Sequence, residues 1–341
     1  MPALAVADAL RASGAEVEFV GGERAEAQLV PAAGYPFHAI QVTGIDRSSL
    51  VKAARAVILA ALALPKALAL LRRLKPDVVI GGGGYVAGPV GLAAALLRIP
   101  LLLTEADSHL GMANRLLAPA AKRVFLSFPI SRRDGRKYVV SGRALPRDTG
   151  KADRAAARAR FGIADDAQCL LVFGGSLGAR TLNHAALEAF GAAAPCTVLH
   201  ASGRRDYDEL RARLDQLGSP PHYILEPYIE PFADALAAAD LTAARAGGSV
   251  LELAAAGLPA VLVPYPYASA DHQTSNARWM EEEGAAVVVP DAELDGPRLA
   301  REVAALLGSP ARLHAMSAAA QRVARPDAAD TIARAALELS V

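Results

Sequence analysis

Glycine-rich segments stand at three points where a run of apolar residues gives way to a helical pattern. They are Gly81 to Gly84, Gly174 to Gly175 and Gly247 to Gly248. Glycine lets a backbone approach a ligand closely, and a helix N-terminus offers unpaired N–H groups and a partial positive charge to a phosphate. The alternative is a tight strand-to-helix turn, but four successive glycines exceed what such a turn requires. The segments therefore favour a ligand that carries phosphates.

Polar side chains follow the last of these glycine segments. Glu252 lies one turn into the next helical pattern, where a carboxylate can accept hydrogen bonds from two hydroxyls of a ribose or a sugar. A favourable charge near a helix N-terminus explains Glu252 equally well. Gln273 and Asn276 carry amides, which both donate and accept, as neutral sugar hydroxyls require. A solvated helix cap that begins at Asp271 is the alternative for this stretch.

A compact cluster of proton-handling groups runs from Thr104 to His109, at the end of an apolar run. Glu105 or Asp107 could act as a general base, and the unperturbed pKa of His109 suits proton transfer. Capping of the helix that contains Asn114 is the alternative for Asp107. We predict Glu105, Asp107 and His109 as catalytic candidates, with Glu105 first.

Charge and composition exclude several classes of function. The 341 residues hold 36 Lys and Arg against 35 Asp and Glu, so no overall field favours nucleic acid. The glycine spacing differs from the GxGxxG of dinucleotide-binding folds, which weakens a nicotinamide interpretation. Cys169 and Cys196 form no ligand-like spacing and are predicted as reduced core residues. We predict no metal, no cofactor and no nucleic-acid partner.

Apolar runs of strand length alternate with helical patterns through both halves, which indicates βαβ units and parallel sheets. The pattern pauses across Ser141 to Asp153. We predict an α/β protein with domains over residues 1–147 and 148–325, and a C-terminal helix over 326–341 that packs back toward the first domain. The predicted strands are Val17 to Val20, Asp77 to Ile80, Pro100 to Thr104, Arg123 to Leu126, Gln168 to Phe173, Thr197 to Ala201, Tyr223 to Glu226, Leu241 to Ala244, Ala260 to Pro264 and Ala285 to Val289.

In order and spacing, these segments resemble the MurG family of bacterial cell-wall glycosyltransferases, glycosyltransferase family 28, from Pro2 to about Ala336. Gly81 to Pro89 is similar to the family's second glycine loop and Gly174 to Ala179 to its third. Arg245 to Pro259 and Asp271 to Asn276 are similar to its donor-binding half. The resemblance implies a GT-B fold: two doubly wound, Rossmann-like domains facing a central cleft, with the acceptor on the first and the donor on the second.

The reaction that the resemblance implies is an inverting transfer of N-acetylglucosamine from UDP-GlcNAc to the 4-hydroxyl of N-acetylmuramic acid in lipid I, which forms lipid II in peptidoglycan synthesis. Helix N-termini at Ser176 and Gly247 could stabilise the departing diphosphate without a metal. The implied partners are UDP-GlcNAc, undecaprenyl-linked lipid I and an anionic membrane surface. The implied location is the cytoplasmic face of the bacterial plasma membrane, as a peripheral protein.

The resemblance also assigns contacts: Ser176 to phosphate, Ile229 to uracil, Glu252 to ribose and Gln273 to the transferred sugar. Arg147 is assigned to the diphosphate or the nucleoside. The predicted substrate-binding residues are Gly83, Gly84, Tyr85, Asn114, Arg147, Gly175, Ser176, Ile229, Arg245, Gly247, Gly248, Glu252, Gln273 and Asn276.

Several positions depart from the family's pattern. Thr104-Glu105-Ala106-Asp107 replaces His-Glu-Gln-Asn, which keeps the carboxylate but changes its neighbours. Leu177 stands where the family usually has Gln, and the segment after Arg245 is one residue short. The family's first glycine loop ends in a His shortly before Pro-Ala-Leu-Ala. This sequence opens with a helical pattern at that Pro2, so we expect it to lack the strand, the first glycine loop and the His, a favoured candidate for the catalytic base. Translation of the DNA upstream of Met1 would decide between a misassigned start, with which the enzyme interpretation holds, and a chain with little turnover.

Two further interpretations stay open. The segment from Leu50 to Lys75 carries an apolar run and the basic residues Lys52, Arg55, Lys66, Arg72 and Arg73, which suits an anionic membrane surface or, equally, a buried helix with solvated ends. The alternatives to the transferase are a sugar-nucleotide-binding protein with impaired or no catalysis, and another UDP-sugar enzyme, such as an epimerase or a glycolipid synthase.

Overall fold

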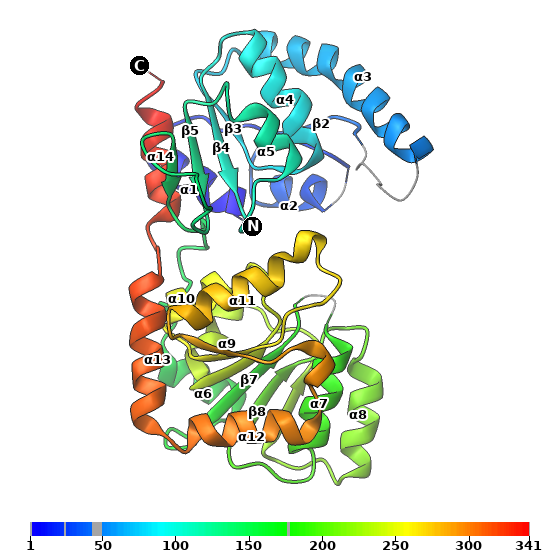
Figure 1. Ribbon diagram of the computed structural model, residues 1–341, viewed down its shortest axis with the longest axis vertical. Coiled ribbons are helices and arrows are strands. Elements are labelled where there is room, and N and C mark those ends of the chain that lie inside the picture. Colours follow the sequence, from blue (N-terminus) through cyan, green and yellow to red (C-terminus); the bar gives the residue numbers. More distant parts are fainter. Residues whose placement is uncertain (1, 24, 43–49, 176–177, 341) are drawn as a thin grey trace. The chain divides into compact units, whose positions relative to one another are not determined.

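The protein divides into two compact units in the computed structural model (Figure 1). The first combines Met1–Pro146 with Arg325–Val341, and the second is Arg147–Ala324. The structure describes residues 2–23, 25–42, 50–175 and 178–340, with the backbone alone in 50–61 and at Ser269. Both units pack helices on parallel strands, which confirms the α/β class.

The first unit contains a sheet of four parallel strands and a separate parallel pair. The sheet order is β3-β4-β5-β6, and β1 pairs with β2. The strands are β1 (Phe19–Gly21), β2 (Phe37–Ala39), β3 (Val79–Gly81), β4 (Leu101–Glu105), β5 (Arg123–Leu126) and β6 (Tyr138–Val140). The helices are α1 (Pro2–Ala12), α2 (Glu26–Ala32), α3 (Leu50–Leu74), α4 (Gly84–Leu96), α5 (Met112–Leu117) and α14 (Ala328–Leu337).

Helix α4 begins at Gly84, inside the segment from Gly81 to Pro89 that resembles the family's second glycine loop. Gly83 and Gly84 adopt positive φ angles of 77° and 75°, so the chain turns tightly behind β3 and the helix starts at once. Pro89 lies inside the helix, where it lacks the N–H of a backbone hydrogen bond.

The C-terminal helix α14 belongs to the first unit and lies beside α1 (Figure 1). Val6 and Ala9 of α1 form one buried cluster with Ile332 and Ala336 of α14. Small side chains on both helices allow this close packing. The chain therefore leaves the first unit after Pro146 and returns to it at Arg325.

The second unit contains one sheet of six parallel strands in the order β12-β11-β10-β7-β8-β9. The strands are β7 (Cys169–Phe173), β8 (Thr197–Ala201), β9 (Tyr223–Glu226), β10 (Leu241–Ala244), β11 (Ala260–Leu262) and β12 (Ala286–Val288). The helices are α6 (Arg154–Phe161), α7 (Arg180–Phe190), α8 (Tyr207–Gln216), α9 (Phe232–Ala238), α10 (Val250–Ala256), α11 (His272–Glu282), α12 (Gly296–Leu307) and α13 (Pro310–Val323). From the centre of the sheet, β7, β8 and β9 follow one another to one side and β10, β11 and β12 to the other, which is the doubly wound arrangement. Its switch point therefore lies between β7 and β10.

The core of the second unit lies where α7, α8 and α12 pack on the sheet. Its buried side chains include Leu170 and Val172 of β7 with Leu182 of α7. Both cysteines are free and buried, as predicted, and burial raises the pKa of Cys169 to about 12 and that of Cys196 to about 11. Neither thiol is a reactive thiolate near neutral pH.

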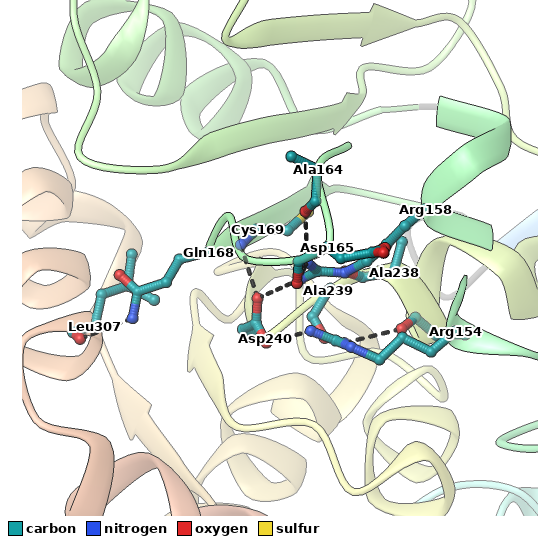
Figure 2. A network of polar contacts seen from close by, with 11 residues as sticks. Arg154, Arg158, Ala164, Asp165, Gln168, Cys169, Ala238, Ala239, Asp240 and Leu307 are labelled. Atoms are coloured by element: carbon teal, nitrogen blue, oxygen red, sulfur yellow. Dashed lines mark hydrogen bonds and ion pairs between the residues drawn. The ribbon is translucent and has the colours of Figure 1, made fainter. Parts of the chain in front are cut away.

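A polar network, the amino-edge network, ties helix α6 to the amino ends of β7 and β10 (Figure 2). Arg158 is 2% exposed, and its guanidinium donates to the carbonyls of Ala164, Asp165 and Ala238. Asp240 accepts from Arg158 Nη2 at 2.8 Å and from the backbone N–H of Cys169 at 2.8 Å. Arg154 adds an ion pair with Asp240 at 2.6 Å and two bonds to backbone carbonyls. Each buried donor of Arg158 thus meets a protein acceptor, as a buried charge requires.

Candidate functional site

The switch point of the second unit brings two of the glycine segments together. Strand β7 ends at Phe173 and its neighbour β10 ends at Ala244, with the two strands in parallel register. Gly174 follows the first strand and Arg245 follows the second. Ligands of doubly wound sheets bind outside the carboxyl ends of the strands at this point. The described glycines of the two predicted ligand-binding segments therefore follow strands that end side by side at the switch point.

The turn from Gly174 to Gly178 can be built only from glycine at several positions. Gly175 and Gly178 have φ angles of 89° and 76°. A Cβ on Gly178 would lie 2.3 Å from the carbonyl oxygen of Ser202, and one on Gly174 would lie 2.3 Å from Ala179 Cβ. The turn leads into the 11-residue helix α7 without a side-chain cap at Ala179. Backbone N–H groups of this first turn are suited to an anion. Ser176, the predicted phosphate contact, lies outside the described residues.

The second turn lies at the end of β10. Arg245 is buried, and its Nη1 donates to the carbonyls of Val263 and Pro264 at 3.2 and 3.3 Å and pairs with Asp291. This side chain braces the ends of β10 and β11, and its predicted ligand contact stays a prediction. Glu252 lies half-buried in the first turn of α10, behind Gly247 and Gly248.

Two amides of α11 face this second turn. Gln273 accepts a hydrogen bond from the backbone N–H of Tyr265 at 2.9 Å, and its Nε2 lies 3.8 Å from where a Cβ on Gly247 would stand. Asn276 is buried and donates to the carbonyl of Ala246 at 3.1 Å. Its Oδ1 is buried, and no partner for it occurs among the described residues. Gln273 is therefore available at the crevice, whereas Asn276 holds the turn from behind.

The remaining predicted residues of this unit lie at its edges. Ile229 is buried in the loop after β9, at the same carboxyl edge of the sheet. Arg147 is the first residue of the unit and is exposed.

In the first unit, the structure brings the other glycine segment to the proton-handling cluster. Thr104 Oγ1 at the end of β4 donates to the carbonyl of Gly81 at the end of β3 at 3.4 Å. A Cβ on Gly83 would lie 3.6 Å from Asn114 Nδ2. Tyr85 is exposed on the first turn of α4. Neighbouring strand ends thus gather the predicted residues of this unit, too.

Glu105 is the organising carboxylate of the loop that follows β4. Its Oε2 accepts from the Gly111 N–H at 2.8 Å and from Asn114 Nδ2 at 2.9 Å, and its Oε1 accepts from the Asp107 N–H at 3.2 Å. Both Glu105 and Asn114 are buried. Asp107 and His109 are half-buried in the loop that Glu105 holds. This geometry gives Glu105 and Asn114 positioning tasks, and the assignment of the base stays a prediction.

The sequence matches known proteins over both units. Residues 1–126 match the glycosyltransferase family 28 N-terminal domain and residues 169–332 match the glycosyltransferase family 28 C-terminal domain. The chain belongs to glycosyltransferase family 28. Its relatives include proteins of Methylococcus capsulatus, 44% identical over 99% of this chain and 94% of the relative, and Moorella thermoacetica, 42% identical over 99% and 95%. Both are named UDP-N-acetylglucosamine–N-acetylmuramyl-(pentapeptide) pyrophosphoryl-undecaprenol N-acetylglucosamine transferase.

Solved structures agree with the family assignment. MurG of Acinetobacter baumannii superposes with a TM-score of 0.80 at 31% identity, over 99% of this chain and 95% of that one. The UDP-GlcNAc 2-epimerase of Neisseria meningitidis reaches a TM-score of 0.69 at 15% identity, over 98% and 95%. The second likeness shows the fold alone. The predicted GT-B fold is thereby confirmed for this family 28 chain.

Sequence reasoning missed a second polar network of this family 28 chain, the carboxyl-edge network. The ring of His200 on β8 lies 2.8 Å from the hydroxyl of Tyr223 on β9 and 3.0 Å from Asn183 Oδ1 on α7. Asn183 Nδ2 donates to the Ser202 carbonyl at 2.9 Å and to Asp206 Oδ2 at 3.0 Å. His200, Tyr223 and Asn183 lie in separate segments and share no local motif. Their polar side chains within otherwise apolar patterns were the only sign of this network in the sequence.

Protonation in the carboxyl-edge network follows from its donors. Both amide hydrogens of Asn183 are directed to oxygens, so its Oδ1 must accept, and His200 donates from Nε2. His200 Nδ1 then accepts from the Tyr223 hydroxyl. Burial lowers the pKa of His200 to about 3, so the ring is neutral at pH 7. Among the described residues, no group of three or more His, Cys, Asp or Glu is placed to hold a metal ion.

Proposed function

We propose that this chain transfers N-acetylglucosamine from UDP-GlcNAc to the undecaprenyl-linked N-acetylmuramyl-pentapeptide lipid I, with inversion, and so forms lipid II for peptidoglycan. The observation that carries the proposal is the identity of about two fifths with transferases of that name over nearly the whole chain. The crevice of the second unit supplies the groups that a nucleotide sugar requires.

The donor is proposed to lie at the switch point of the second unit. Gly174, Gly175 and Gly178 with the start of α7 suit its diphosphate, because glycine lets the backbone approach a ligand closely and a helix start offers unpaired N–H groups. Glu252 is placed for the ribose hydroxyls. The Tyr265 N–H takes the oxygen of Gln273, which turns the amide nitrogen toward Gly247 and leaves it to donate to the transferred sugar. Charge that grows on the departing diphosphate would be stabilised by the same N–H groups.

The acceptor is proposed to reach the first unit from a membrane surface. Leu96 on α4 and Leu116 on α5 are 59% and 72% exposed, and the two helices touch where Gly91 meets Leu117. Arg98, Arg115 and Lys122 are exposed in the same part of the unit. Apolar contact with flanking basic residues suits the anionic cytoplasmic face of the plasma membrane. No helix in the described part of the chain is long and apolar enough to cross a membrane.

The described part of α3 has a buried face and an exposed face, on which Leu62 is 61% exposed, so both interpretations of this segment stay open. In the described part of α3, Ala63, Ala67 and Leu71 are buried against α4, while Lys66 and Arg72 are exposed. Lys52 and Arg55 lie where only the backbone is described. The exposed apolar side chains of α4 and α5 therefore carry this part of the proposal, and co-sedimentation with phosphatidylglycerol vesicles, reduced in Leu96→Glu with Leu116→Glu, tests it.

A donor and acceptor assay tests the function. The chain is incubated with UDP-GlcNAc or UDP-GalNAc, with and without a lipid I analogue, and products are separated by chromatography. We expect UDP release and sugar transfer that require both UDP-GlcNAc and the acceptor. Conversion of UDP-GlcNAc to an epimer without acceptor would establish the epimerase alternative, and binding without any product would establish the non-catalytic one.

The role of Glu252 has a sharper readout. Wild type should bind UDP more tightly than 2′-deoxy-UDP, because Glu252 accepts from the ribose hydroxyls. Glu252→Ala should bind the two nucleotides alike. Glu281→Ala, which removes a carboxylate from the last turn of α11, is the matched control. A difference between the nucleotides that persists in Glu252→Ala would remove the ribose assignment.

A further inference from the structure

The loop between β8 and α8 lies against the glycine turn at the switch point. The carbonyl of Ser202 lies so close to Gly178 that a side chain at position 178 would collide with it. The same loop continues through Arg204 and Arg205 to Asp206, whose side chain is buried. Strand β8 neighbours β7 in the sheet, so this loop borders the crevice on the side away from β10.

Arg205 is an exposed cation that the protein holds in a fixed direction. Its Nε donates to Asp206 Oδ1 at 2.9 Å and its Nη2 donates to Asp206 Oδ2 at 3.2 Å. The guanidinium side chain remains 60% exposed. A long exposed side chain normally samples many rotamers, and a two-point attachment to a buried carboxylate removes much of that freedom.

The carboxylate that holds Arg205 is itself held from the interior. Asp206 Oδ2 accepts from Asn183 Nδ2, and Asn183 is fixed by His200 and, through it, by Tyr223. The hydrogen bond from Arg205 lowers the pKa of Asp206, so the carboxylate stays ionised. Burying a polar group costs free energy unless the group has a hydrogen-bond partner. Here the series of buried, hydrogen-bonded side chains ends at the exposed guanidinium of Arg205, beside the turn proposed to bind phosphate.

Two other arginines of this unit pair with carboxylates away from Asp206. The hydrogen bond to Asp206 and the charge of its carboxylate raise the pKa of Arg205, so the guanidinium keeps its charge. Arg245 is committed to Asp291 and backbone carbonyls, and Arg180 pairs with Glu209.

We propose that Arg205 binds the diphosphate of the nucleotide sugar, held in place for this task by Asp206 and Asn183. This inference rests on the proposed function, since it deepens the donor site. The guanidinium donates to a phosphate oxygen of the bound UDP-sugar and keeps that contact as the diphosphate leaves with additional negative charge. The position is available to any nucleoside diphosphate whose base fits the loop after β9.

Calorimetric binding of UDP, UMP and uridine tests the proposal. Arg205→Ala should weaken UDP binding about tenfold or more, the usual range for a lost charge-assisted hydrogen bond. It should weaken UMP less and leave uridine unchanged. Arg205→Lys should lie between wild type and Arg205→Ala, because the charge remains but the two-point attachment to Asp206 is lost.

Arg213→Ala is the matched control. Arg213 is exposed in the last turn of α8, toward the amino edge of the sheet, and its removal changes the net charge of the unit equally. Equal losses of UDP and uridine binding in Arg205→Ala, or a UDP affinity like that of wild type, would overturn the assignment of Arg205 alone. Failure of wild type to bind UDP would overturn the proposed donor and this inference with it.

Discussion

Two polar networks stand at opposite edges of one sheet in the second unit, and they end differently. The amino-edge network joins Arg154, Arg158 and Asp240 to backbone carbonyls and to the start of β7 (Figure 2). The carboxyl-edge network runs from Tyr223 through His200, Asn183 and Asp206 to Arg205. The first ends on the protein's own main chain, whereas the second ends on a guanidinium that is 60% exposed.

The difference separates a network that holds the fold from one that we propose also positions a ligand contact. Every described bond of Arg158 goes to a protein acceptor, so the amino-edge network has nothing left to offer a ligand. The carboxyl-edge network fixes a residue whose remaining donors face solvent beside the crevice. A parallel sheet makes this division natural, because its carboxyl edge carries the ligand and its amino edge is free for stability.

The largest effect is expected from breaking the amino-edge network at its buried centre. Arg158→Met removes one of the three donors to Asp240 and the guanidinium donor to three carbonyls, all from a buried site, so it should lower the free energy of unfolding by about 3–5 kcal/mol. The UDP affinity of the folded protein should not change. Urea unfolding followed by circular dichroism gives the first quantity and calorimetry the second.

Arg154→Met is the control for that experiment. Arg154 makes bonds to the same Asp240 and to two carbonyls but is 47% exposed, so its loss should cost about 1 kcal/mol or less. Equal destabilisation by the two substitutions would mean that burial of an arginine does not determine how much it contributes to the free energy of unfolding. A loss of UDP affinity in Arg158→Met would contradict the proposal that the amino-edge network serves stability alone.

A smaller loss of stability, combined with a loss of binding, is expected at the carboxyl edge. Asn183→Leu removes the acceptor of the His200 N–H and the donor to the Ser202 carbonyl and Asp206, so it should cost about 2–3 kcal/mol. UDP affinity should also fall, because Asp206 no longer fixes Arg205. Urea unfolding and calorimetry on the same samples measure both. Wild-type UDP affinity in a folded but destabilised Asn183→Leu protein would show that this network serves stability alone.

Much of the fold could be predicted from the sequence. The six strands of the second unit were predicted to within two residues at each end, because buried parallel strands are continuous apolar runs bounded by turn residues. In the first unit β2 and β6 were missed. Each has only three residues, β2 contains His38, and the apolar run of β6 is bounded by Lys137 and Ser141, so neither produces an apolar run long enough to predict a strand.

The site could be predicted only where it is local in sequence. The glycine turns, Glu252 and Gln273 lie in short segments that directly follow strand ends, and the structure gathers those segments at the switch point. His200, Asn183 and Tyr223 are 17 and 23 residues apart on three elements, and their hydrogen bonds exist only once the sheet has formed. Arg205 could not be predicted either, because the neighbouring sequence does not show that Asp206 is buried. The buried Asp206 is what holds the Arg205 side chain in place.

The smallest expected effect is a pH dependence of the free energy of unfolding. It tests whether the buried ring of His200 in the carboxyl-edge network is neutral. The pKa of His200 falls from 6.5 in the unfolded chain to about 3 in the folded one, so the unfolded chain binds an extra proton between these values. The stability contributed by the neutral ring is complete above pH 6.5 and is lost as the pH falls toward 3. Between pH 7 and pH 5 this loss should be about 2 kcal/mol.

Urea unfolding at the two pH values measures that loss, with His200→Gln as the variant that cannot titrate. Gln can still donate to Asn183, so the variant should be less stable at pH 7 but should lose about 2 kcal/mol less than wild type on going to pH 5. The amino-edge variants leave His200 and its hydrogen bonds in place, so they should keep the wild-type slope. Parallel slopes in wild type and His200→Gln would mean that the pKa of His200 is the same in the folded and the unfolded chain, so that the ring gains its proton in the fold as well. Donation from the Tyr223 hydroxyl to Nδ1 would then be lost at pH 5, because both nitrogens of a protonated His donate.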